Sequence, residues 1–299
     1  MSSIVKTLAR PPFIGLFAFF VVFLVQALGH TVMILMEKGF GEEYVFHSAT
    51  AMGLFGAWLL FIGMKNDNEV PATWLGFFAG TFLWTGWVEF SFVAYAWHLD
   101  VQPVLDASGE IATKPEYLLM SSSLGVMMAT LVYFLLNKET RCNFFHWFQR
   151  NLKMSTGKPS RGYQRNFAAI TALETIYVIW FFYLALLLIY DEAILGETHP
   201  VVYVLFFANT IWAIYLINRL LRFWRVATAI RYAIPTAIIA WNCVELLGRW
   251  SFFTEIWVHP MDYALEMGLI FGAVVIAVVL SYLTPARGKA EFTKPAETT

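Results

Sequence analysis

Two glutamates, Glu89 and Glu245, lie within long apolar runs of the sequence. An ionisable side chain inside a membrane segment costs about 2.5–3.5 kcal/mol on insertion scales, so such a residue is usually functional or paired. Arg249 lies four residues after Glu245 on the same helical face, a spacing that predicts an ion pair. Glu89 has no charged residue at the equivalent position, so we expect it to be protonated, hydrogen-bonded or paired with another helix. Glu89, Glu245 and Arg249 are the candidate catalytic residues.

A second group of side chains could bind a metal or relay a proton. His259, Asp262 and Glu266 have the spacing i, i+3 and i+7, which places them on one face of a helix. An imidazole and two carboxylates could hold a divalent metal. His30, with Met33 nearby, would suit copper. The alternative is structural: Asp262 caps a helix after Pro260, and His30 is a hydrogen-bonded residue of a packed helix.

Tryptophans surround both glutamates, and Trp84, Trp87 and Trp241 are the candidate cofactor-binding residues. Flat aromatic side chains in this number would suit a hydrophobic ligand such as a quinone. The competing interpretation is an aromatic belt at the membrane interface together with packing inside the helix bundle.

The composition indicates that these residues lie on helices within a membrane. Hydrophobic residues make up 59% of the chain and charged residues 14%, which is far from the average of soluble domains. Apolar stretches long enough to cross about 30 Å of hydrocarbon predict an all-α, polytopic membrane protein with about eight transmembrane helices. The predicted spans are 12–36, 45–64, 72–98, 117–136, 166–190, 200–218, 230–257 and 263–283.

Lys and Arg are distributed very unevenly between the two sides of these spans. One side holds only Lys38 and Lys114, Arg249 lies within a span, and the rest of the 20 basic residues lie on the side of both termini. The positive-inside rule therefore predicts cytoplasmic termini, an acidic outer face and, in a bacterial cell, the inner (plasma) membrane. The expected partners are the lipid bilayer and other membrane subunits, and no nucleic-acid partner is expected.

The two halves of the chain resemble one another, because Val88-Glu89 is echoed by Val244-Glu245 and Gly41-Glu42 by Gly196-Glu197. This predicts two parallel four-helix repeats, since an even number of spans gives both copies the same orientation. The predicted regions are a first repeat at 1–136, a basic cytoplasmic loop with an interfacial helix at 137–165, a second repeat at 166–284 and a disordered tail at 285–299.

Motif searches exclude several kinds of chemistry. The sequence has no nucleotide-binding glycine pattern, no G-x-S-x-G, no H-E-x-x-H and no histidine pairing of the kind that holds b-type haem. Most polar residues lie in the outer halves of the spans. We therefore expect an outward, periplasm-facing acid and histidine site for redox or metal chemistry, or a quinone-interacting subunit of a membrane complex.

Two other functions are compatible with the same residues, and neither an enzyme nor a non-enzyme is favoured by the sequence. One is a proton- or cation-coupled transporter that uses Glu89 and Glu245, and the other is a non-catalytic membrane assembly subunit. An eight-helix double bundle is similar in architecture to quinol-interacting membrane anchor subunits, but architecture does not fix function.

Overall fold

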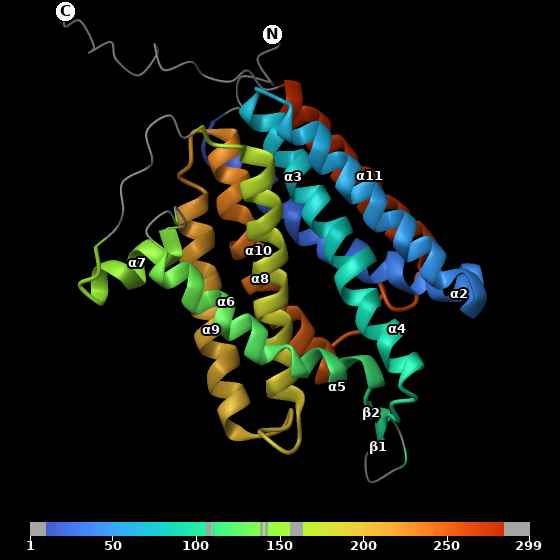
Figure 1. The fold of residues 1–299 in the computed structure, drawn as a ribbon. Helices are drawn as coiled ribbons and strands as arrows, with labels where there is room; N and C mark the ends of the chain where they lie inside the picture. The colour runs from blue at the N-terminus through green and yellow to red at the C-terminus, as the bar shows by residue number, and fades with distance from the viewer. Residues whose placement is uncertain are drawn as a thin grey trace, which may run out of the picture. The chain divides into compact units, whose positions relative to one another are not determined.

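The computed structural model describes residues 10–105, 109, 111–137, 140, 143–155 and 164–283. These residues are almost entirely helical, with one short two-stranded ribbon (Figure 1). Seven described helices are long and apolar enough to cross a membrane, which confirms the prediction of an all-α, multi-pass membrane protein. The predicted tail at 285–299 lies outside the described residues.

The chain divides into two compact units, residues 1–91 with 167–299 and residues 92–166. This grouping does not follow the two predicted halves, and the four-plus-four repeat stays a prediction. All of the candidate site residues lie in the first unit.

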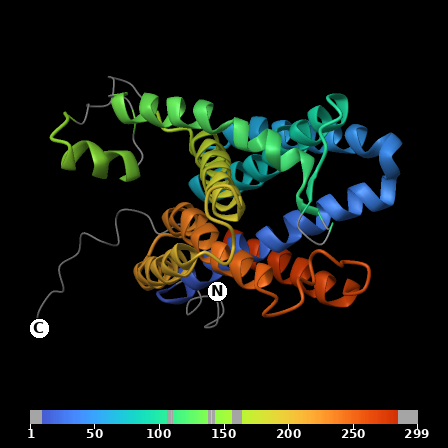
Figure 2. The ribbon, with the colours of Figure 1, turned by 90° about the horizontal axis from the view of Figure 1, so that it is seen from below.

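The first unit contains α2 (Phe13–Met64), α3 (Glu69–Leu83), η1 (Trp84–Glu89), α8 (Phe167–Tyr190), α9 (Pro200–Leu220), α10 (Val226–Arg249) and α11 (Ala264–Leu283). Helix α2 is two spans joined at Gly41, whose φ of 69° is a conformation that glycine adopts without steric cost. Figure 2 shows its two arms meeting at this bend. The two arms correspond to the first two predicted spans, since the membrane-crossing stretches are Phe13–Gly39 and Tyr44–Met64.

The third predicted span is a helical segment interrupted by a π-helix. Every residue from 69 to 98 is helical, but α3 and the following α4 (Phe90–His98) are separated by η1. Neither helix alone reaches the length of a span, so the exact number of spans is not confirmed. The interruption matters because π-helical turns occur often at functional sites, and Glu89 is the last residue of this one.

Glycines allow the helices of the first unit to approach closely. A Cβ on Gly80 would lie 2.7 Å from the carbonyl oxygen of Ala172, and one on Gly76 would overlap the backbone of Ala168. These pairs, each four residues apart, form a contact of small residues between α3 and α8. Such contacts are favoured in membranes, where close packing takes the place of the hydrophobic effect between helices.

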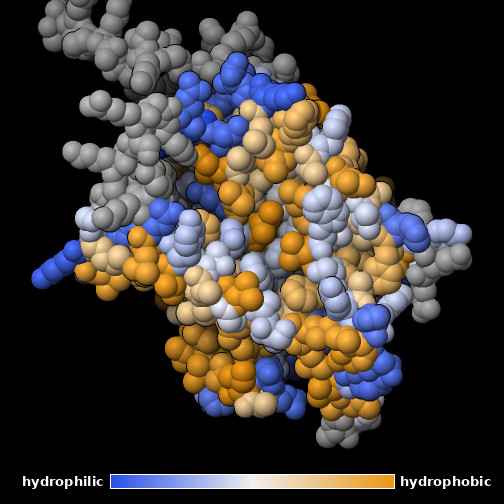
Figure 3. Space-filling model, viewed as in Figure 1, coloured by the Kyte–Doolittle hydropathy of each residue, from blue (hydrophilic) through white to orange (hydrophobic). Residues whose placement is uncertain are grey.

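The core of the first unit is apolar and follows α10 against the first arm of α2. Its most deeply buried members include Val21, Val22, Ala233, Ile234 and Ala237. Large hydrophobic side chains on α9 and α11 are exposed, for example Val204, Ile211 and Leu269. Figure 3 shows hydrophobic residues over much of the visible face, as expected for helices that contact lipid.

The second unit contains the end of α4, the strands β1 (Val104–Leu105) and β2 (Ile111–Thr113), α5 (Pro115–Ser122), α6 (Leu124–Leu136) and α7 (Asn143–Asn151). The strands pair in antiparallel orientation. Helix α7 lies within the region where an interfacial helix was expected. Its Gln149 is buried and donates to the carbonyl oxygen of Leu135 at 2.9 Å, which ties α7 to the end of α6.

Candidate functional site

His30 and Glu245 meet between α2 and α10. His30 Nε2 lies 3.1 Å from Glu245 Oε1, and the Trp241 indole N–H donates to the same oxygen at 2.6 Å. The His30 side chain keeps 35% of its surface exposed and that of Glu245 keeps 21%. The pair is therefore held in place within two membrane-crossing helices but is still accessible to a second molecule.

The local sequence explains this arrangement. The first arm of α2 and α10 run in the same direction, because Gly15 packs near the start of α10, on Leu220, while His30 contacts Glu245 near its end. Trp241 and Glu245 are four residues apart and share a helical face. The His30 ring is stacked on Trp241 with 6.2 Å between ring centres, so the indole fixes both partners of the pair.

The segment that follows α10 folds back over this site. Helix α10 ends at Arg249, eight residues before the predicted end of its span at 257, and residues 250–263 form turns. Trp257 in this segment is buried against Trp241, 4.8 Å between ring centres, and its carbonyl accepts a bond from Thr31 at 3.4 Å. The predicted continuous helix is thus replaced by a cap over the pair.

Glu255, from the same segment, carries its carboxyl group close to Glu245. A Cβ on Gly248 would overlap a carboxylate oxygen of Glu255 and lie 2.8 Å from its Cδ, so the carboxyl group rests directly on the backbone of α10. Partial burial raises the pKa of Glu255 above its ordinary value, and the negative charge of Glu245 raises it further. His30, Arg249 and His259 act in the opposite direction.

Arg249 pairs with Glu197, at 3.2 Å between Nε and Oε2, and it also acts electrostatically on Glu245. The guanidinium lies over the ring of Tyr190, 4.9 Å from its centre. Glu245 itself bonds His30 and Trp241, contacts that the sequence did not predict. The Tyr190 hydroxyl is buried and has no hydrogen-bond partner among the described residues.

Glu89 is buried, with 6% of its surface exposed, and lies within electrostatic range of the His30 ring. Its neighbours in η1 point elsewhere. Trp84 packs near Trp180 and Tyr183 of α8, and the Trp87 indole donates to the carbonyl of Thr50 at 3.3 Å. Of the three predicted cofactor-binding tryptophans, Trp241 is therefore the one that touches the His30–Glu245 pair.

The predicted metal ligands do not share one helical face. Helix α11 begins at Ala264, so Glu266 is helical while His259 and Asp262 lie in the preceding turns, where the Asp262 N–H bonds the His259 carbonyl at 3.1 Å. Within the described ranges, no three His, Cys, Asp or Glu residues form a group that could hold a metal ion. His30, the fourth predicted ligand, lies beside Glu245.

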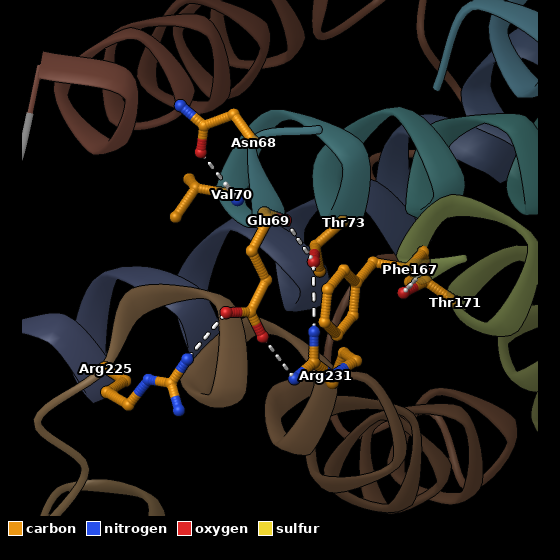
Figure 4. A network of polar contacts seen from close by, with 8 residues as sticks. All are labelled: Asn68, Glu69, Val70, Thr73, Phe167, Thr171, Arg225 and Arg231. Carbon is orange, nitrogen blue, oxygen red and sulfur yellow. Dashed lines mark hydrogen bonds and ion pairs between the residues drawn. The ribbon is translucent and has the colours of Figure 1, made fainter. Parts of the chain in front are cut away.

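A second polar network lies at the opposite end of α10 (Figure 4). Glu69 accepts from Arg225 at 2.7 Å and from Arg231 at 2.9 Å, and Arg231 also donates to the Thr73 hydroxyl at 3.2 Å. The Arg231 guanidinium lies 4.9 Å from the ring centre of Phe167. These contacts fasten the start of α3 to the start of α10.

Four residues of these two networks were not predicted as site residues, namely Glu255, Glu197, Tyr190 and Glu69. A signal existed for Glu69, which is one of few acidic residues among the arginines on its side of the spans. For Glu255 the signal was hidden, because the apolar run containing it was predicted to continue as a helix. Only the turn after Arg249 brings its carboxyl group back over α10.

Comparisons of the chain with protein-family models, with curated proteins and with solved structures gave no match.

Proposed function

We propose that this is a membrane-embedded protein whose His30–Glu245 pair binds and releases protons and thereby serves the redox chemistry of a quinone-type molecule, either in this chain or as a subunit of a membrane complex. The observation that carries the proposal is the shared oxygen, Glu245 Oε1, which contacts both His30 Nε2 and the Trp241 N–H. An imidazole and a carboxylate in contact can hold or pass one proton at a position fixed by the indole.

The accessibility of His30 supports a ligand at this position. About one third of its side-chain surface is open, while its ring is stacked on Trp241. A flat molecule from the lipid phase could reach the imidazole without unpacking the core. A quinone carbonyl would accept a hydrogen bond from His30. Its reduction to a quinol takes two electrons from a redox partner outside this site and two protons, which the pair can pass one at a time.

The apolar core supports a site that exchanges protons with one side only. Arg231 and Glu245 are separated by 14 residues of α10, or about 21 Å along the helix axis. Between them the packing against α2 is made by side chains such as Val22, Ile234 and Ile238. This contact between α2 and α10 is apolar and gives protons no route along it, so we infer that the pair communicates with the aqueous phase at the C-terminal end of α10.

The topology forms part of this proposal. Eight spans in two parallel four-helix repeats, both termini in the cytoplasm and a location in the inner membrane would place the C-terminal end of α10 at the periplasmic face. Single cysteines at Glu192 and Arg222 in a Cys142→Ser, Cys243→Ser background test this. In intact cells an impermeant thiol reagent should label position 192 and not position 222. The reverse pattern would overturn the orientation.

Quinone binding can be tested on the purified full-length protein in detergent. Titration with decylubiquinone should quench tryptophan fluorescence in a saturable manner, and His30→Gln should abolish the saturable component. Glu192→Gln, which changes an exposed loop carboxylate, is the control and should behave as wild type. Quenching that rises linearly in all three proteins would reflect partition into detergent and would contradict the proposal.

A proton- or cation-coupled transporter that uses Glu89 and Glu245 is the second candidate. It is favoured by ion pairs at both ends of α10, Arg231 with Glu69 and Arg249 with Glu197, which could act as two gates. Proton flux into proteoliposomes that depends on Glu245 would select this function. A non-catalytic assembly role predicts neither flux nor quinone binding, and a stable co-purifying membrane subunit.

A further inference from the structure

The turn segment 250–263 brings one carboxyl group to the boundary between the His30–Glu245 pair and the exterior. Glu255 is partly exposed, whereas Trp257, two residues later, is buried beside Trp241. Thr31 holds the backbone of the segment through the carbonyl of Trp257. The segment therefore packs an aromatic side chain against Trp241 on one side of the pair and leaves Glu255 as a partly exposed acidic group beside it.

Gly248 determines how close this carboxyl group can come. It lies three residues after Glu245, so the two positions share a face and are separated by about 4.5 Å along the helix axis. Because Gly248 has no side chain, the Glu255 carboxyl group occupies the space where a Cβ would be. A carboxyl group in van der Waals contact with this backbone is about one helical turn from Glu245.

The charged and titratable groups around Glu255 come from every neighbouring element. Electrostatic interactions link it to His30 on α2, to Glu245 and Arg249 on α10, to Tyr190 on α8 and to His259 in its own segment. Glu255 is thus one member of a continuous cluster. Within that cluster it combines partial exposure with contact to the backbone one turn from Glu245.

We propose that Glu255 is the proton relay between the aqueous phase and the His30–Glu245 pair. In the uptake step the Glu255 carboxyl O–H bond breaks, its proton passes to the Glu245 carboxylate, and a new O–H bond forms there. Glu255 is left as a carboxylate and regains a proton from hydronium, which becomes water. Release is the reverse, and no electron transfer is involved.

The raised pKa of Glu255 is consistent with this role, because a carboxyl group that keeps its proton closer to neutral pH is a more effective donor and acceptor. Arg249 attracts the ionised carboxyl group of Glu255, and the ion pair with Glu197 holds the guanidinium in position. The relay assignment rests on the proposed function in one respect, namely that the His30–Glu245 pair binds protons.

The test is a pH-jump experiment on the full-length protein in detergent, with protons as the only added ligand. Trp241 donates to Glu245, so protonation of the pair should change tryptophan fluorescence. We expect Glu255→Gln to slow this change on the order of 10²-fold, the lower end of the effect of a positioned acid–base group, while its amplitude stays as in wild type. Glu255→Asp should recover part of the rate, and Glu192→Gln should leave it unchanged.

Gly248→Ala provides a second route to the same conclusion. It keeps the Glu255 carboxyl group in the chain but displaces it from α10, and it should slow the change as Glu255→Gln does. A wild-type rate in both variants would overturn the relay while leaving the proton-binding pair intact. A fluorescence change that is absent in wild type, or that persists in a His30→Gln, Glu245→Gln double variant, would overturn the proton-binding pair and the relay with it.

Discussion

Substitution of Glu245 by glutamine and by leucine should separate its hydrogen-bonding role from its charge. Glu245 Oε1 accepts from the Trp241 indole at 2.6 Å and contacts His30 Nε2 at 3.1 Å. Glutamine has an oxygen in the same position and can accept both bonds, so it loses only the assistance of the charge. Leucine has no acceptor, and the indole of Trp241, which is 6% exposed, would then lack a partner.

The two substitutions should therefore differ in their effect on the free energy of unfolding. A buried donor left without an acceptor costs about 1–3 kcal/mol, whereas the His30 side chain is 35% exposed and loses less when its acceptor is removed. We expect Glu245→Gln to lower the free energy of unfolding by less than about 1 kcal/mol. Glu245→Leu should lower it by about 1–3 kcal/mol more than Glu245→Gln does. The gap corresponds to roughly a 5- to 150-fold change in the folding equilibrium constant.

Reversible unfolding in mixed detergent micelles, followed by circular dichroism, would measure both values. The matched control is the pair Glu192→Gln and Glu192→Leu at an exposed loop position, for which no comparable gap is expected. Equal stability of the two Glu245 variants would refute the reasoning, because it would mean that the acceptor oxygen contributes nothing to the packing of α2 on α10.

Three further predictions concern the helices around the pair. Gly80→Ala should destabilise the protein by about 1–3 kcal/mol, because its Cβ would lie 2.7 Å from a backbone oxygen of α8. Gly272→Ala, with open space around it inside α11, should not destabilise the protein in the same unfolding assay. Glu255→Gln should stabilise the protein near neutral pH, with an advantage that disappears in acid. Because the pKa of Glu255 is raised in the folded state, ionisation of this group destabilises the wild-type protein as the pH rises past the ordinary pKa of a glutamate. Unfolding titrations at several pH values measure this effect. A difference in unfolding free energy between wild type and Glu255→Gln that is the same at every pH would contradict the prediction. The ion pair between Arg249 and Glu197 should contribute no more than about 1 kcal/mol, since both side chains are 43% exposed. A double-mutant cycle of Arg249→Ala with Glu197→Ala separates this coupling from the contact of Arg249 with Tyr190, and a larger coupling would contradict the prediction.

The sequence was sufficient to predict the class of fold because hydrophobicity acts over whole segments. Runs of about 20 apolar residues predicted the first arm of α2, α8 and α9, and each is present within a few residues of its expected bounds. The end of α10 was predicted too late, because residues 250–257 are rich in aromatic side chains and carry a single charge, that of Glu255. What ends the helix is a tertiary arrangement, in which Trp257 is buried under α2 and α11 and Ser251 takes a positive φ of 57°.

The candidate site was predicted in part. His30 and Glu245 were both selected, but as members of different groups, since nothing in a single sequence reports which helices are neighbours. Spacing along one helix suggested Arg249 as the partner of Glu245, and the structure adds His30 from α2, 215 positions away in the chain. Contacts between helices depend on small residues such as Gly76 and Gly80, whose partners in α8 cannot be deduced from spacing alone.

The π-helical turn η1 has a consequence for any experiment that reads helix faces by periodicity. A π-helix contains more residues per turn than the 3.6 of an α-helix, so the direction of each side chain after Trp84 is shifted from the α-helical phase. A cysteine scan along residues 69–91 should therefore show accessibility with one phase before Trp84 and a different phase after it. If the accessibilities are fitted with one α-helical wheel for the whole segment, Glu89 will be assigned to a face that it does not occupy.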